Sequence, residues 1–216
     1  MDWPALRSSA WRLATAWVVL TLVVTAVGSR LVVSVGPVIE LAVEQLMPGF
    51  VTAISRVPRD EGAGDVAMQL QAMRPLRIAD DYWVTPWVKV EERINAGHDL
   101  VPAIILFAVL LAWPYRRIGD AARALCLGLL VAVGLITWMT SVHFAGLFEI
   151  SLQRVAAQYR QARPQPLFLA QMIFFESGGQ WLLALLGATA IGAFTTRHTG
   201  RLRGQPATPS SEIPAR

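Results

Sequence analysis

The sequence predicts an all-α membrane protein with four transmembrane helices and a small external loop region, which in one alternative contains a short β-hairpin. Of the 216 residues, 54% are hydrophobic and only 16% are charged, and the mean hydropathy is +0.46. The apolar residues gather in long runs that are almost free of charge. One soluble core of this size would not need such runs, whereas a hydrocarbon layer about 30 Å thick would.

The basic residues indicate membrane topology rather than nucleic-acid binding. The net charge of +4 comes from 18 arginines and one lysine against 15 acidic residues, and the arginines gather beside the apolar runs. We therefore expect membrane lipid and another membrane protein as partners, and no nucleic acid. One cysteine excludes an intramolecular disulfide, and three histidines leave little for a metal cluster. The sequence predicts no metal, cofactor or catalytic site.

The first span is predicted at residues 13–36, after a cytoplasmic segment at residues 1–12. About 24 helical residues are long enough to cross the hydrocarbon layer. Small residues at Ala26 and Gly28 have the spacing of a signal-peptide cleavage site, so a removed signal is an alternative. The apolar run continues beyond Gly28, and this favours a retained anchor.

An external loop is predicted at residues 37–99. Apolar residues between 37 and 57 recur at roughly helical spacing, which indicates an amphipathic interfacial helix broken at Pro48 and Gly49.

The second half of this loop allows two interpretations. Residues 66–78 and 82–90 partly alternate apolar and polar side chains, as the strands of a hairpin do. Alternatively, Trp83 and Trp87 lie among the lipid headgroups, where indole rings are favoured.

Residues 100–115 are the second predicted span, although their apolar core of about 14 residues is short for a crossing. A cytoplasmic loop at 116–123 leads to the third span at 124–148, which contains no Asp, Glu, Lys or Arg.

An external loop at 149–166 precedes the fourth span at 167–194, whose first part is expected to lie outside the membrane. Residues 197–216 have few large apolar side chains and are predicted to be a disordered cytoplasmic tail.

The distribution of arginine predicts that both termini are cytoplasmic. The amino terminus, the loop at 116–123 and the start of the tail, at residues 197–203, carry eight arginines on one side of four spans, while the loop at 37–99 has six basic and ten acidic residues. The loop at 149–166 disagrees, because it carries three arginines on the external side.

Three ionisable residues fall in the external half of the predicted spans: Arg30, His143 and Glu176. Three more lie near the same surface: His98, Asp99 and Glu149. Charged groups in hydrocarbon are costly unless they are paired or reach water, so Arg30 and Glu176 are the expected pair. Their simplest role is to hold two helices in register.

No nucleophile and base are placed together by the sequence. Cys126 and His143 are 17 positions apart on one predicted helix, or about 25 Å. Ser141 and His143 are two positions apart and face different directions.

Small residues recur at every fourth position of the last span, at Ala184, Ala188 and Gly192. Such a face lets another helix approach closely. It serves either packing within this chain or contact with a partner.

An anchor, an external segment and then residues 90–117, VEERINAGHDLVPAIILFAVLLAWPYRR, give the chain a layout that resembles small membrane proteins associated with exosortases. The resemblance implies an accessory of a bacterial inner-membrane system that cleaves and anchors exported proteins. The chain would not be the protease, because an exosortase needs cysteine, arginine and histidine together on the external side.

Three functions follow as hypotheses. The first is a non-enzymatic membrane accessory or scaffold subunit. The second is a transporter or channel component with a polar site at Arg30 and Glu176. The third is an intramembrane enzyme that uses His143 or Glu176.

Overall fold

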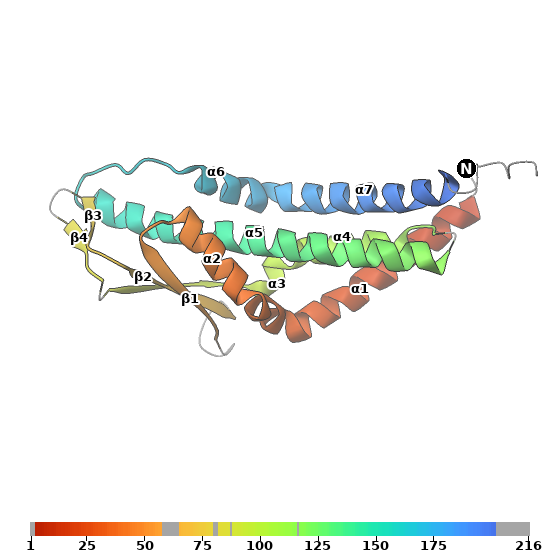
Figure 1. Ribbon diagram of the computed structural model, residues 1–216, viewed down its shortest axis with the longest axis horizontal. Coiled ribbons are helices and arrows are strands. Elements are labelled where there is room, and N and C mark those ends of the chain that lie inside the picture. The colour runs from red at the N-terminus through yellow and green to blue at the C-terminus, as the bar shows by residue number, and fades with distance from the viewer. Residues whose placement is uncertain (1–2, 58–64, 80–81, 87, 116, 202–216) are drawn as a thin grey trace, which may run out of the picture.

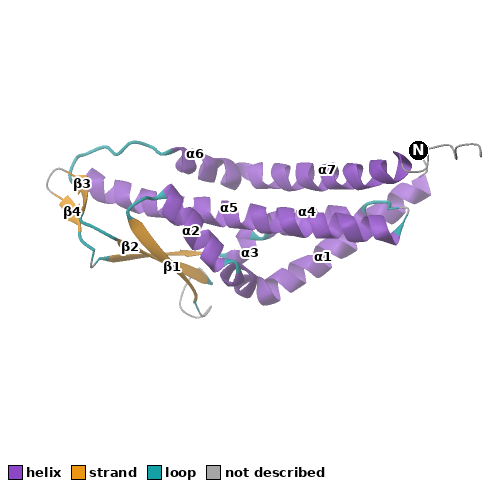
Figure 2. Ribbon diagram, viewed as in Figure 1, coloured by secondary structure: helices purple, strands orange, loops and turns teal. Residues whose placement is uncertain are grey.

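The computed structural model describes residues 3–57, 65–79, 82–86, 88–115 and 117–201. Long helices run side by side along the molecule, and a small sheet lies at one end (Figures 1 and 2). The chain begins with α1 (Trp3–Ser34) and α2 (Gly36–Leu46). The remaining helical elements are α3 (Ala96–Asp99), α4 (Val101–Ala112), α5 (Ile118–Gln158), α6 (Leu167–Phe174), the π-helical segment η2 (Phe175–Gly179) and α7 (Gln180–Arg201).

Three helical stretches are long and apolar enough to cross a membrane: Ser9–Ser34, Ile118–Gln158 and Leu167–Thr196. The second predicted span, at residues 100–115, corresponds to the shorter apolar helix Ala96–Ala112. Its 17 residues rise about 25 Å, which is less than the hydrocarbon thickness. The structure thus confirms a helical, membrane-type protein and does not confirm four spans.

α4 lies in the interior of the bundle, where it packs against α1, α5 and α7. Most of its side chains are buried, including Leu106 and Leu110. A side chain added at Gly128 of α5 would meet Leu110, so the two helices approach closely there. The short helix is therefore enclosed by the three longer ones.

α5 is longer than a membrane crossing requires. Its 41 residues span about 60 Å, twice the thickness of the hydrocarbon layer. Its carboxyl-terminal part lies beside the sheet (Figure 1), and Ser151 donates a hydrogen bond to Glu92 of that sheet.

The sheet is antiparallel, with strand order β1 (Phe50–Arg56), β2 (Val66–Ala72) and β5 (Lys89–Ile94). A separate hairpin is formed by β3 (Leu76–Ala79) and β4 (Tyr82–Val84). The all-α prediction is therefore incomplete, and its hairpin alternative is the part that agrees with the structure.

The amphipathic helix predicted at residues 37–57 is wrong in its second half, which forms β1. Gly49 has φ +98°, a left-handed conformation that ends the preceding helical turn. The seven residues that follow pair with β2 from Phe50↔Ala72 to Arg56↔Val66. A strand of this kind depends on a partner that lies far along the chain, so local spacing could not identify it.

The outer edge of β1 is covered by α2. Glu44 accepts a hydrogen bond from the Thr52 backbone N–H at 3.0 Å, and Glu40 accepts one from the Ile54 N–H at 2.6 Å. These carboxylates take the place of a further strand and protect the edge from pairing with another chain.

The sheet and the bundle share one apolar core. Buried side chains of α1, α2, β2 and α5 pack together, among them Val32, Ile39, Met68, Leu70 and Phe148. The sheet is therefore fixed to the end of the bundle and is not a separate domain.

Two further predictions concern the tail at residues 197–216 and the two tryptophans of the external loop. α7 continues to Arg201, so residues 197–201 are helical where a disordered tail was predicted, and residues 202–216 lie outside the described part. Trp83 is exposed on β4, whereas Trp87 lies outside the described residues.

Candidate functional site

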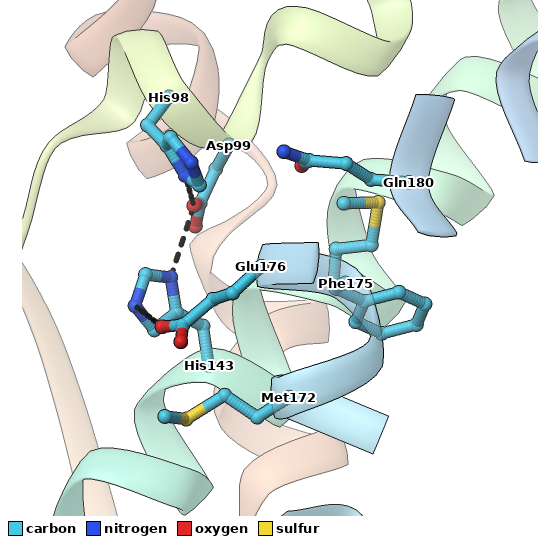
Figure 3. A pocket seen from close by; sticks show the side chains of 8 residues that line it. His98, Asp99, His143, Met172, Phe175, Glu176 and Gln180 are labelled. Carbon is cyan, nitrogen blue, oxygen red and sulfur yellow. Dashed lines mark hydrogen bonds and ion pairs between the residues drawn. The ribbon is translucent and has the colours of Figure 1, made fainter. Parts of the chain in front are cut away.

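A cluster of ionisable side chains lies where the sheet meets the bundle. His98 and Asp99 come from α3, His143 from the middle of α5, and Glu176 from η2 (Figure 3). They line one small pocket together with Gln180 and three apolar residues, Met139, Met172 and Phe175.

The sequence around α3 fixes the position of His98 and Asp99. Asn95 precedes the helix and accepts a hydrogen bond from the Gly97 N–H at 2.9 Å, as an N-cap residue does. Asp65 accepts a second one from the Ala96 N–H at 2.8 Å. The start of α3 is therefore attached to the sheet, and its last residues enter the bundle.

Asp99 is the centre of the cluster. Its Oδ1 lies 3.0 Å from Nδ1 of His143 and 3.4 Å from Nδ1 of His98. On the other side of the His143 ring, Nε2 lies 3.7 Å from Oε1 of Glu176. The four residues form a chain of contacts in which carboxylates and imidazoles alternate.

Burial differs strongly along this chain of contacts. The side chain of Asp99 is only 4% exposed, that of His143 is 21% exposed, and those of His98 and Glu176 are about half exposed, at 49% and 48%. The pocket is therefore open towards His98 and Glu176 and closed at Asp99.

Asp99 and His98 shift each other's pKa. The hydrogen bond with Asp99 is the main reason that the pKa of His98 is raised above its ordinary value. Burial would raise the pKa of Asp99, but the hydrogen bonds with His143 and His98 outweigh it, and the pKa of Asp99 is lowered.

The second oxygen of Asp99 has no partner. Oδ2 is buried and accepts no hydrogen bond within the described part of the chain. A buried carboxylate oxygen without a partner is costly, and natural proteins rarely leave one so.

This arrangement suits a metal ion. Two imidazoles and a carboxylate each offer one donor atom, and the three atoms from His98, Asp99 and His143 lie within 4.8 Å of one another. The sequence predicted no metal site, because His143 lies 44 residues from Asp99 along the chain and the three residues form no recognised ligand motif. Sequence analysis placed all three residues near the external surface, and this common depth in the membrane was the signal that could have identified them as one site.

The predicted pairing of Arg30 with Glu176 is not observed among the described contacts. Arg30 is exposed on α1, and Glu176 instead faces His143. The reason is the position of α4, which packs between α1 and α7. The polar cluster predicted as Arg30, His143 and Glu176 thus keeps its last two members and gains His98 and Asp99.

The small-residue face of α7 is occupied within the chain. Ala184 and Ala188 are fully buried, and a side chain at Gly192 would meet the ring of Trp113. α7 packs closely on α4 there, so this face is not available to a partner.

Cys126 and Ser141 lie apart from a catalytic base. Cys126 is exposed near the start of α5, about 25 Å along the helix from His143. Ser141 donates a hydrogen bond to the Thr137 carbonyl at 2.7 Å.

No protein-family model, curated protein or solved structure matches this chain.

Proposed function

We propose that this chain is a multi-pass accessory subunit of the bacterial inner membrane, which holds a partner membrane protein at its external surface and is not itself an enzyme. The observation that supports this function best is the common core of sheet and bundle. A sheet attached in this way is a rigid platform, and a rigid surface loses little entropy when a partner binds.

The outer face of the sheet has the composition of a wet protein interface. Along the register, exposed and partly exposed side chains alternate with the buried ones, and most of them are polar or charged. We call this face the platform. It consists of Val51, Ala53, Ser55, Gln69, Gln71, Lys89, Glu91 and Arg93.

The arrangement of nucleophiles supports an accessory role over a protease. The one cysteine lies at the opposite end of the bundle from the platform, and Ser141 is bound to a backbone carbonyl. On the resemblance of residues 90–117, the partner is an exosortase-type enzyme, which would supply the catalytic residues that this chain lacks.

The proposal includes four membrane crossings with both termini in the cytoplasm. The amino-terminal end of α1 and the carboxyl-terminal end of α7 lie at the end of the bundle opposite the sheet (Figure 1). Arginine-rich segments next to these ends favour the cytoplasmic side. Residues 100–115, which include α4, would make the second crossing, with the longer helices shielding its ends.

Purification of the full chain from its native membrane in mild detergent tests the proposal. We expect a second membrane protein in a stoichiometric complex, whose mass is measured by light scattering. Lys89→Glu reverses a charge on the platform and should release this partner. Arg154→Glu reverses an exposed charge on α5, off the platform, and should not.

Two results would contradict the proposal. A chain that stays a solitary monomer in several mild detergents has no stable partner to hold. A partner that remains bound equally to the Lys89→Glu and Arg154→Glu variants does not bind through the platform.

A further inference from the structure

We propose that His98, Asp99 and His143 bind one divalent transition-metal ion of the zinc type. This site does not depend on the accessory function. It would tie α3 and α5 together at the point where the sheet meets the bundle.

The donor set selects the class of metal. Two imidazole nitrogens and a carboxylate suit Zn²⁺, Fe²⁺ or Mn²⁺, whereas Mg²⁺ and Ca²⁺ prefer oxygen ligands alone. The pocket is lined by two sulfur-containing residues, Met139 and Met172. Their thioether sulfur atoms are weak ligands for these ions, so the nitrogen and oxygen donors determine the choice of metal.

The separation of the donors is close to that of a bound state. Atoms that bind one ion tetrahedrally at about 2.0–2.2 Å lie about 3.3–3.6 Å apart. Oδ1 of Asp99 lies 3.0 Å from Nδ1 of His143 and 3.4 Å from Nδ1 of His98, which is close to this separation. All three donor atoms are within 4.8 Å of one another, so the two imidazoles would move together by up to about 1.4 Å on binding.

The buried Asp99 carboxylate is the independent observation that points to a ligand. This side chain is 4% exposed and lines the pocket, and its Oδ2 has no hydrogen-bond partner in the described ranges. A cation coordinated by Asp99 would satisfy this oxygen and offset its desolvation.

Glu176 would hold the His143 ring from its other side. Oε1 of Glu176 lies 3.7 Å from Nε2, whereas Asp99 faces Nδ1. Histidines that bind a metal commonly offer their second ring nitrogen to a carboxylate, which fixes the orientation of the ring.

Metal titration of the purified full chain, freed of its affinity tag and stripped with chelator, tests the proposal. Isothermal titration with Zn²⁺ should give one ion per chain with a dissociation constant in the micromolar range or below. Co²⁺ should give the d–d absorption of a site with nitrogen and oxygen ligands. Mg²⁺ at the same concentration should give neither signal.

Variants separate this site from adventitious binding. His143→Ala and His98→Ala should each weaken Zn²⁺ binding at least tenfold. His198→Ala is the matched control, because position 198 follows Glu176 by 22 residues, or about 33 Å of helix, and its variant should bind as the unchanged chain does.

The alternative is a cluster held only by its own ion pairs. In that case the stripped chain would bind no Zn²⁺, or the His98 and His143 variants would bind it as strongly as the His198 variant, and either result overturns the proposal. Because His98 is half exposed, its replacement leaves the fold intact, which circular dichroism verifies.

Discussion

Glu149 is a buried carboxylate on α5 that Arg163 reaches from the loop after the helix. The guanidinium donates two hydrogen bonds, Nε to Oε1 at 3.0 Å and Nη2 to Oε2 at 3.1 Å. The Glu149 side chain is 5% exposed and that of Arg163 is 25% exposed. Removing one partner of such a pair leaves a charge buried alone.

We expect Arg163→Gln to lower the free energy of unfolding by about 2 kcal/mol, since Arg163 is partly exposed and the loss is smaller than for a fully buried pair. Thermal unfolding in detergent measures the change. The matched control is Arg154→Gln, which replaces an exposed arginine of α5 and should cause no measurable shift. Equal melting temperatures for the two variants would disprove the argument.

At this scale the sequence predicted which ionisable residues lie near one surface better than which of them touch. Depth along the spans placed Arg30, His98, Asp99, His143, Glu149 and Glu176 together, and all of them except the exposed Arg30 lie in the polar contacts described above. The partners were not predictable, because the neighbours of a side chain depend on which helices pack together. In the proposed orientation, the pairing with Glu149 gives Arg163 a reason to lie on the external side, against the usual charge rule.

Gly178 determines the shape of the element that carries Glu176. Its φ of +102° is a conformation that a residue with a side chain rarely adopts, although no atom near it would clash with a Cβ. The cost of replacing this glycine is therefore a matter of backbone strain and not of space.

We expect Gly178→Ala to lower the free energy of unfolding by about 1–2 kcal/mol and to displace Glu176. Gly134→Ala is the matched control. It lies on an exposed part of α5 with nothing within 4 Å, so alanine there should leave stability unchanged or raise it by up to about 1 kcal/mol. Unfolding of both variants in one detergent provides the comparison, and equal effects would refute the assignment of strain.

Elements that are buried in lipid could be predicted from sequence, whereas elements made by distant pairing could not. The cores of α1, α5 and α7 follow from long apolar runs, because lipid burial requires apolar side chains on every face of a helix. β1 could not be recognised in the same way. Its apolar residues fit a helical spacing too, and only the register with β2 makes it a strand.

The proposed orientation of the whole molecule across the membrane can be tested by chemical labelling. In a Cys126→Ser background we expect a membrane-impermeant maleimide to label Gln69→Cys on the platform from the outside of intact cells. Gly119→Cys, exposed at the other end of α5, should react only after the membrane is opened. The reverse pattern would invert the proposed orientation.

The overall arrangement was predictable in part for a physical reason. Arginine near the ends of apolar runs gives a sidedness, and the amino-terminal end of α1 and the carboxyl-terminal end of α7 lie together in the structure (Figure 1). The order of helices around α4 was not predictable, because several packings bury the same apolar faces. That order brought Glu176 to His143 and left Arg30 at the periphery.

α5 runs without a break from Ile118 to Gln158, a rise of about 60 Å. It contacts β5 of the sheet as well as α2, α4, α6 and α7. A displacement of the sheet would therefore not remain local, because it would shift every helix that packs on α5.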